Sequence, residues 1–119
     1  MSPFEFLLPY SLEEALSLLD PEDPGIRPVG GGTAVMLMMK AGVLRPTRLV
    51  SLHKIGPRHS AVTVNASGEL VLGGLACLLE IERNESVRQG WPMLVHALRG
   101  VANVRVRAVA TIGGNLSHA

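Results

Sequence analysis

Three consecutive glycines followed by a threonine, residues 30–33, constrain the fold of this chain more than any other feature. They stand between residues 26–29, which have the pattern of a short strand, and residues 34–40, which have the pattern of a helix ended by Gly42. Residues 49–52 have the pattern of a second strand. Because a connection between parallel strands is almost always right-handed, this order predicts a small βαβ unit. The glycines should lie at the carboxyl end of the first strand and the amino end of the helix.

Glycine loses more backbone entropy on folding than any other residue, so three in a row need a structural reason. Backbone amides exposed by glycine, beside a helix amino end and the Thr33 hydroxyl, can bind a phosphate without a cationic side chain. The alternative is a tight strand-to-helix turn with Thr33 as the N-cap. No Lys-Ser or Lys-Thr pair follows the glycines, which excludes a P-loop, and Val35 stands where a Rossmann fingerprint has its third glycine.

A capping-box pattern at Ser11-Leu12-Glu13-Glu14 predicts a helix, in which Ser11 caps an orphan amide and Glu14 reaches back to the Ser11 amide. Its apolar residues recur at i, i+3, i+4 and i+7 and predict one buried face, formed by Leu12, Ala15, Leu16 and Leu19. The helix should pack on a sheet.

The second half of the chain begins with a predicted antiparallel hairpin. Val62 and Val64 alternate with polar residues, residues 66–68 offer a turn, and residues 70–72 return. Helices are predicted over residues 78–83 and residues 93–102, the latter started by Trp91-Pro92. We expect the chain to end with a β-like stretch that leads into a second glycine turn.

This second turn has the sequence Thr111-Ile112-Gly113-Gly114-Asn115. It combines a hydroxyl and an amide side chain with two adjacent glycines, which is suited to binding a polar ligand. A glycine bulge or turn with Asn115 as a helix cap is the alternative.

Composition excludes several classes of function. The 11 Lys and Arg against 10 Asp and Glu give no charge excess that would favour nucleic acid or an anionic membrane. The longest apolar run reaches only from Ala34 to Met39, whereas a membrane-spanning helix needs about 20 residues. No basic region followed by an apolar stretch stands at the N-terminus, so we expect a cytoplasmic protein. Cys77 is the only cysteine, which rules out an internal disulfide or a Cys-ligated iron–sulfur cluster within the chain.

The remaining polar residues give no catalytic or metal site. The histidines have no metal-binding spacing, and we expect them on the surface or at caps: His53, His59, His96 and His118. Cys77 should be a small buried residue, and the methionines Met36, Met38 and Met39 should fill the core. A solvated helix face is expected for Glu80, Glu82, Arg83 and Glu85.

The two glycine motifs, in this order and at this separation, resemble the FAD-binding domain of the molybdenum hydroxylases, which is the medium subunit of carbon monoxide dehydrogenase and the middle segment of xanthine dehydrogenase. Further matching residues run from about residue 4 to the end: Pro9, Glu14, Ala15, Met39, Lys40, Ala41, Gly42, Pro46, Leu49, Val50, Leu72, Gly73, Pro92, Val106, Arg107 and Ala110. The chain departs from the family pattern at Ala34, where an acidic residue is frequent, at Ser51, where Asp is common, and at Ala108, where Asn usually follows the arginine.

The resemblance implies an α/β (α+β) fold, the two-lobed PCMH-type FAD-binding domain. Residues 1–119 would be part of this domain, with a small parallel βαβ lobe up to about residue 55 and, from about residue 56, the start of a lobe with an antiparallel sheet that is truncated at the C-terminus. FAD would bind between the lobes. The implied FAD-binding residues are Val29, Gly30, Gly31, Gly32, Thr33, Ala34, Val35, Thr111, Ile112, Gly113, Gly114 and Asn115.

The function implied by the resemblance is that of an FAD-binding subunit or fragment in a molybdenum hydroxylase-type oxidoreductase. Electrons would pass from the iron–sulfur clusters of a 2Fe-2S small subunit through FAD to an external acceptor, and a molybdopterin-binding large subunit would oxidise the substrate. The cofactor would carry the chemistry, so no side chain here is assigned as catalytic, and the isolated chain is not expected to be active alone. The alternative is a truncated, non-catalytic assembly or interaction module that has lost FAD binding.

Overall fold

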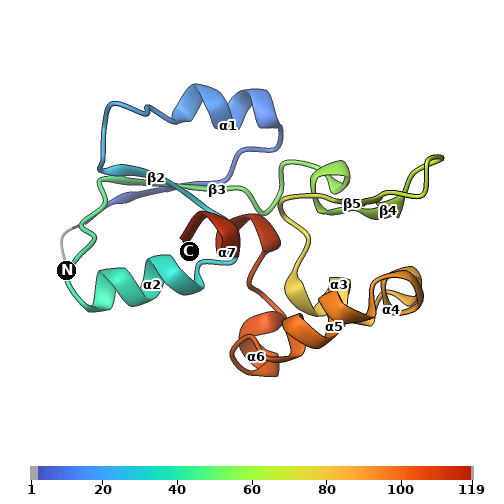
Figure 1. Cartoon of the computed structure of the whole chain (residues 1–119). Coiled ribbons are helices and arrows are strands. Elements are labelled where there is room, and N and C mark those ends of the chain that lie inside the picture. The colour runs from blue at the N-terminus through green and yellow to red at the C-terminus, as the bar shows by residue number, and fades with distance from the viewer. Residues whose placement is uncertain (1–2, 119) are drawn as a thin grey trace. The chain divides into compact units, whose positions relative to one another are not determined.

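The computed structural model describes residues 3–118, so Met1, Ser2 and Ala119 lie outside the described residues. The chain forms two compact units, of which one ends at Pro57 and the other begins at Arg58 (Figure 1). The first unit contains a parallel sheet and the second an antiparallel strand pair, both with helices, so the predicted α/β class is confirmed. No helix among residues 3–118 is long and apolar enough to cross a membrane.

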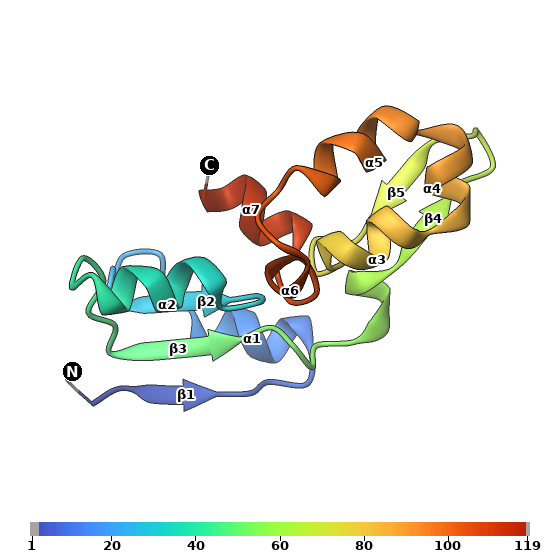
Figure 2. The same ribbon diagram turned by 90° about the horizontal axis from the view of Figure 1, so that it is seen from below.

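The first unit is built on three parallel strands, β1 (Glu5–Leu7), β2 (Ile26–Val29) and β3 (Arg48–Ser51), in the order β1-β3-β2. The central strand β3 is the most buried, with Leu49, Val50 and Ser51 all shielded from solvent. Helix α1 (Leu12–Leu18) covers one face of the sheet and α2 (Thr33–Lys40) the other (Figures 1 and 2). The predicted βαβ unit, β2-α2-β3, is confirmed.

Strand β1 was not predicted from the sequence. It has only three residues, and its first two are exposed, so it carries no alternation of apolar and polar residues. Its strand character comes from pairing along β3, where Glu5 lies opposite Arg48 and Leu7 opposite Val50. This pairing partner lies more than forty residues away in the chain.

Helix α1 begins as predicted, because the Ser11 hydroxyl accepts a hydrogen bond from the Glu14 amide at 3.1 Å. The rest of the predicted capping box is wrong: the Glu14 carboxylate accepts from the Tyr10 amide at 3.2 Å, one residue before Ser11. The predicted apolar face is also wrong, since Leu12 and Leu16 are exposed and only Ala15 is buried. A helix of seven residues on a three-stranded sheet makes its close contact through one small side chain.

Helix α2 packs into a small core with its neighbouring strands. Met39 lies there with Val29 and Leu49, whereas Met36 is exposed and Met38 is half-buried. The predicted role as core filler is therefore right for Met39 and wrong for Met36. The helix ends as predicted, since Gly42 after it adopts a φ of 75°, which favours glycine.

The second unit contains the 3-10 helix η1 (Pro57–Ser60, which begins at the unit boundary), an antiparallel hairpin and five short helices. The hairpin pairs β4 (Val62–Val64) with β5 (Leu70–Leu72), as predicted. The helices are α3 (Leu78–Arg83), α4 (Glu85–Gly90), α5 (Pro92–Arg99), α6 (Val104–Arg107) and α7 (Ile112–His118). Their buried residues form one core: Ala76, Leu78, Ile81, Val87, Val95, Leu98 and Ala110.

The structure confirms α3 and corrects the segment that follows it. Helix α5 begins at Pro92 and ends at Arg99, before residue 102, and α4 was not predicted. The predicted β-like stretch before the second glycine motif is wrong, because α6 occupies residues 104–107. Its two valines alternate with arginines as in a strand, but the Asn103 side chain accepts a hydrogen bond from the Val106 amide at 3.0 Å and starts a helical turn.

Glu82 also departs from the prediction. We expected it on a solvated helix face, but it is buried, and its carboxylate accepts a hydrogen bond from Arg107 Nε at 2.9 Å. Arg99 Nε lies 3.7 Å from the other carboxylate oxygen. The charge is tolerated inside the unit because it is paired with two guanidinium groups.

Candidate functional site

The first glycine motif forms the connection between β2 and α2. Val29 ends the strand, Gly32 is the N-cap of the helix, and Thr33 is its first residue. Gly32 has φ 81° and ψ −2°, a left-handed conformation that residues with a side chain rarely adopt. A Cβ atom added at Gly32 would have only one heavy atom within 4 Å, the Val29 Cγ1 at 3.6 Å. The connection is therefore open to an approaching group.

No side chain caps the amino end of α2, a property that it shares with α3 and α5. The first amides of any helix have no partner within the helix. Side chains accept from such amides in α1, α4 and α6, where the caps are Ser11, Asn84 and Asn103. In α2 the N-cap is Gly32, which provides no side-chain hydrogen bond, and no acidic residue lies in the first turn. The alternative in which Thr33 is the N-cap is thus wrong.

This arrangement leaves the positive end of an eight-residue helix without an acidic side chain or a cap. The amides of Thr33, Ala34 and Val35 belong to that first turn. Helix starts of this kind bind anions, because the amides point at the ligand and the helix dipole favours negative charge. The first motif therefore has the geometry of an anion site.

The second glycine motif is the start of helix α7, and here the protein itself uses the amides. The Gly114 amide donates to the Thr111 hydroxyl at 3.0 Å. Three neighbouring amides donate to carbonyl oxygens: Ile112 to Ala76 at 2.9 Å, Gly113 to Gly74 at 2.8 Å, and Asn115 to Thr111 at 2.9 Å. Asn115 lies inside the helix, so the alternative in which it caps a helix is wrong.

The glycines of the second motif are packed rather than open. A Cβ atom added at Gly113 would lie 2.6 Å from the Gly74 carbonyl oxygen, and one added at Gly114 would lie 2.9 Å from the Thr111 hydroxyl. Thr111 is buried, whereas Gly114 and Asn115 are exposed. What this motif offers to a ligand is therefore the exposed Gly114 and the exposed side chain of Asn115. The two motifs belong to different units, and the geometry of each stands by itself.

Comparison with known proteins connects the two motifs to a family. Residues 2–119 match the family described as "FAD binding domain in molybdopterin dehydrogenase". The chain belongs to this family. The resemblance seen in the sequence is thereby confirmed, and FAD is the cofactor of these domains.

Relatives of this FAD-binding domain come from several organisms. The chain is 30% identical over 116 residues to the glyceraldehyde dehydrogenase medium chain of Sulfolobus acidocaldarius. The alignment covers 98% of this chain and 40% of that protein. It is 26% identical over 106 residues to the xanthine dehydrogenase FAD-binding subunit of Escherichia coli O157:H7. That alignment covers 89% of this chain and 36% of the relative.

A solved structure of carbon monoxide dehydrogenase from Hydrogenophaga pseudoflava aligns with a TM-score of 0.91 at 27% identity, over 98% of this chain and 40% of that one. The FAD-binding domain described here thus spans about 40% of the length of its relatives.

The residues of the first motif fit the diphosphate of FAD. A diphosphate is an anion that needs donors, and the first turn of α2 provides amides without a side-chain cap. The left-handed Gly32 removes the side chain that would otherwise occupy the space above the turn.

The other candidates from the sequence do not form a second polar site. His53, His96 and His118 are exposed, and His59 is half-buried. No group of three or more His, Cys, Asp or Glu side chains in the described part of the chain could hold a metal ion. Cys77 is half-buried rather than buried and pairs with Thr111 in an isolated antiparallel bridge.

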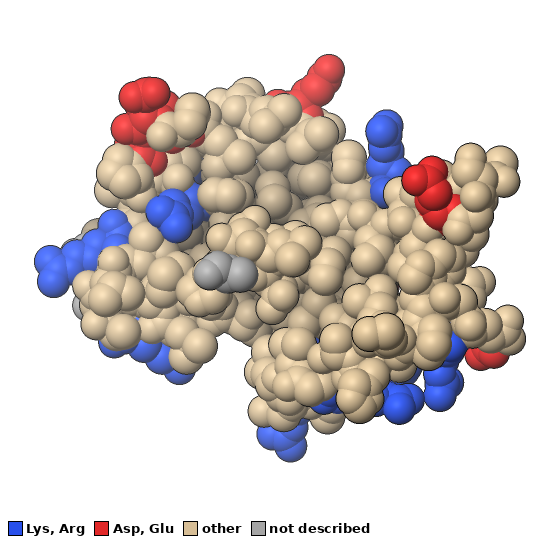
Figure 3. Space-filling model, in the orientation of Figure 1, with Lys and Arg blue, Asp and Glu red and all other residues tan. Residues whose placement is uncertain are grey.

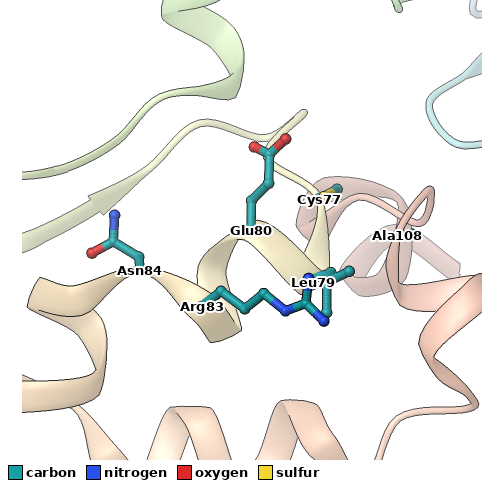
Figure 4. A pocket seen from close by; sticks show the side chains of 6 residues that line it. All are labelled: Cys77, Leu79, Glu80, Arg83, Asn84 and Ala108. Atoms are coloured by element: carbon teal, nitrogen blue, oxygen red, sulfur yellow. The ribbon is translucent and has the colours of Figure 1, made fainter.

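A hollow that the sequence did not predict lies on the second unit. Its volume is about 370 Å³, and it is lined by Cys77, Leu79, Glu80, Arg83, Asn84 and Ala108 (Figure 4). Figure 4 shows Cys77 at the amino end of α3 and Ala108 on the segment beside it. Glu80 and Arg83 bring opposite charges to the rim, so the hollow has no charge excess that would favour an anion.

Charged side chains of both signs lie on the surface of the protein. Acidic and basic side chains both occur on the face shown in Figure 3, with broad uncharged areas between them.

Proposed function

We propose that the chain binds the diphosphate of FAD at residues 29–35 and that residues 111–115 also contribute to FAD binding. The observation that carries this proposal is the uncapped start of α2 at the left-handed Gly32, in a chain that belongs to an FAD-binding family. Gly30, Gly31 and Gly32 let the backbone approach the diphosphate closely.

Each part of the first motif has a distinct role in the proposal. The amides of Thr33, Ala34 and Val35 donate hydrogen bonds to phosphate oxygens, and the Thr33 hydroxyl adds a further donor. Val29, which is buried at the end of β2, fixes the start of the turn to the core of the first unit. Packing of Val29 thus anchors the turn to the core, and the amides of the turn remain available to the ligand.

The second motif contributes through exposed groups, because its amides already have partners within the protein. The exposed Asn115 side chain can donate or accept, and the exposed Gly114 beside it has no side chain that would block a ligand. Thr111, Ile112 and Gly113 hold the start of α7 in place through their backbone and hydroxyl contacts.

In the whole oxidoreductase, FAD would supply the redox chemistry, taking electrons from the iron–sulfur clusters of a 2Fe-2S small subunit and passing them to an external acceptor. A molybdopterin-binding large subunit would oxidise the substrate. The relatives that support this assignment are named as dehydrogenase medium chains and FAD-binding subunits. The residues of this chain hold and orient the cofactor, and none acts as an acid or base.

A titration of the purified chain with FAD tests the proposal. We expect saturable binding, together with flavin absorbance that stays with the protein after gel filtration. If the folded chain, checked by circular dichroism, shows neither, the FAD-binding role of the isolated chain is wrong. The chain would then be better described as an assembly or interaction module.

A further inference from the structure

A buried ion pair joins two helices of the second unit and has no part in the site described above. The Glu82 carboxylate on α3 accepts a hydrogen bond from Arg107 Nε at the end of α6, at 2.9 Å. Both side chains are only 11% exposed. Arg99, the second partner of Glu82, is 55% exposed and lies farther away, at 3.7 Å. The closest contact of the buried carboxylate is therefore Arg107.

Arg107 also holds the connection that precedes α6. Its Nη1 donates to the carbonyl oxygens of Val101 and Ala102, both at 3.1 Å. Ala102 has a φ of 48°, a left-handed conformation that is uncommon for a residue with a side chain. One guanidinium group thus fixes α3, the strained connection and α6 to one another.

The segment that follows Arg107 runs alongside α3 and the residues before it. The Ala110 carbonyl oxygen accepts from the Leu78 amide at 2.9 Å, and Thr111 pairs with Cys77. The amides of Ile112 and Gly113 then donate to Ala76 and Gly74.

Residues 107–113 therefore contact residues 74–82 at both ends of the segment. At the end with the glycine motif the contacts are backbone hydrogen bonds, and at Arg107 the contact is a side-chain ion pair. In between, the Ala110 amide donates to the Val106 carbonyl oxygen at 2.8 Å, which joins α6 directly to the start of the motif.

We propose that Glu82 and Arg107 are positioning residues for the second glycine motif. By fixing α6 against α3, they place the Ala110 carbonyl oxygen beside the Leu78 amide, and the Ile112 and Gly113 amides beside the carbonyl oxygens of Ala76 and Gly74. A buried ion pair is a poor source of net stability, because desolvation offsets much of the attraction, whereas its geometry is specific. The consequence for FAD affinity rests on the proposed function, but the positioning itself does not.

Amide hydrogen exchange in the full chain tests the positioning without FAD. In Arg107→Met we expect the amides of Ile112, Gly113 and Gly114 to exchange at least about tenfold faster, because the loss of the ion pair frees α6 and opens their hydrogen bonds locally. The amides of the hairpin, β4 and β5, should keep their exchange rates. Arg48→Met is the matched control, since Arg48 pairs with Glu5 at 3.0 Å and donates to the Leu18 carbonyl oxygen at 3.2 Å, but lies in the first unit.

Two results would overturn the inference. One is unchanged exchange at Gly113 and Gly114 in folded Arg107→Met, and the other is an equal acceleration of all amides in the second unit, which would indicate a role in stability alone. If Arg107→Met does not fold, amide exchange in Glu82→Gln provides the same test. This substitution keeps the size of the side chain and removes its charge. Arg107→Lys keeps the charge but loses the planar group that binds the Glu82 carboxylate and two backbone carbonyl oxygens, so we expect only partial rescue.

FAD titration of the same variants separates this inference from the proposed function. We expect Arg107→Met to weaken FAD binding by at least about fivefold while Arg48→Met leaves it unchanged, because only Arg107 orders the second motif. Faster exchange at the motif with unchanged FAD affinity would refute the link between the ion pair and the cofactor. If the unaltered chain binds no FAD, the proposed function fails, and the exchange rates still decide the positioning.

Discussion

The two glycine motifs use glycine for different physical reasons. In the first, Gly32 needs the left-handed conformation, and the space around an added Cβ atom is nearly empty. In the second, Gly113 has no need of a positive φ, but an added Cβ atom would meet the Gly74 backbone at 2.6 Å. Glycine permits an unusual conformation at one motif and a close approach of two backbone segments at the other.

The hydrogen bonds show the same difference. The second motif satisfies the first-turn amides of α7 with the Thr111 hydroxyl and with carbonyl oxygens of the same unit. The first motif has no side-chain cap at α2. A ligand can therefore supply what the protein lacks at the first motif, whereas the amides of the second motif already have partners within the protein.

The largest effect is expected where glycine is packed. In Gly113→Ala the new methyl group would meet the Gly74 carbonyl oxygen and carbon, which are backbone atoms and cannot rotate away. We expect the free energy of unfolding of the second unit to fall by about 2–3 kcal/mol, the cost of overpacking. Chemical denaturation followed by circular dichroism measures it.

Gly74→Ala is the control for this prediction, because a Cβ atom there has nothing within 4 Å. It changes the other partner of the same hydrogen bond, yet it should cost less than about 1 kcal/mol, the usual range for a substitution that meets no clash. Equal losses in the two variants would show that the contact between the two backbones does not set the cost.

A second effect should separate conformation from binding at the first motif. Gly32→Ala places a side chain at φ 81°, which should cost about 1–2 kcal/mol of stability. Gly42→Ala, at the other end of α2 with φ 75° and open space, should cost a similar amount.

FAD affinity should distinguish these two variants. Gly32→Ala should weaken FAD binding by at least about tenfold, or 1.4 kcal/mol, because the methyl group lies where the diphosphate approaches. Gly42→Ala should leave it unchanged. The same Kd for both variants, measured by flavin fluorescence, would remove the first motif from the site.

A smaller effect is expected at the cap of α7. Thr111→Val keeps the shape of a buried side chain but removes the hydroxyl that accepts from the Gly114 amide, which should cost about 1 kcal/mol of stability. Thr111→Ser keeps the hydroxyl and should retain most of the cap. Thermal unfolding of the two variants measures the difference, and a less stable Thr111→Ser would contradict the capping role.

The sequence predicted the first unit well because its signals are local. The glycines at residues 30–32, the apolar run after them and Gly42 define a strand, a turn and a helix within about twenty neighbouring residues. Strand β1 was not predicted, because it forms by pairing with β3, whose residues lie more than forty positions away in the sequence. The two glycine motifs, together with further matching residues from about residue 4 to the end, also predicted the family.

The second unit was harder to predict because distant residues decide its structure. Helix α7 has two glycines, which are poor helix formers, directly after its first residue, and its start is held by the carbonyl oxygens of Gly74 and Ala76. The charge of Glu82 suggested solvent exposure, but its partner Arg107 lies 25 positions later. That the amides of the second motif are used within the protein could only be learned from the structure.

The smallest expected effect concerns Thr33, the first residue of α2. Its hydroxyl caps no helix, so Thr33→Val should change the free energy of unfolding by less than about 0.5 kcal/mol, as for substitutions away from structural hydrogen bonds. FAD affinity should nevertheless fall about fivefold, the worth of roughly one neutral hydrogen bond to the diphosphate. Thr33→Ser should keep that affinity. The opposite pattern, a stability loss without a change in Kd, would make the first motif a structural turn like the second, and the contrast between them would disappear.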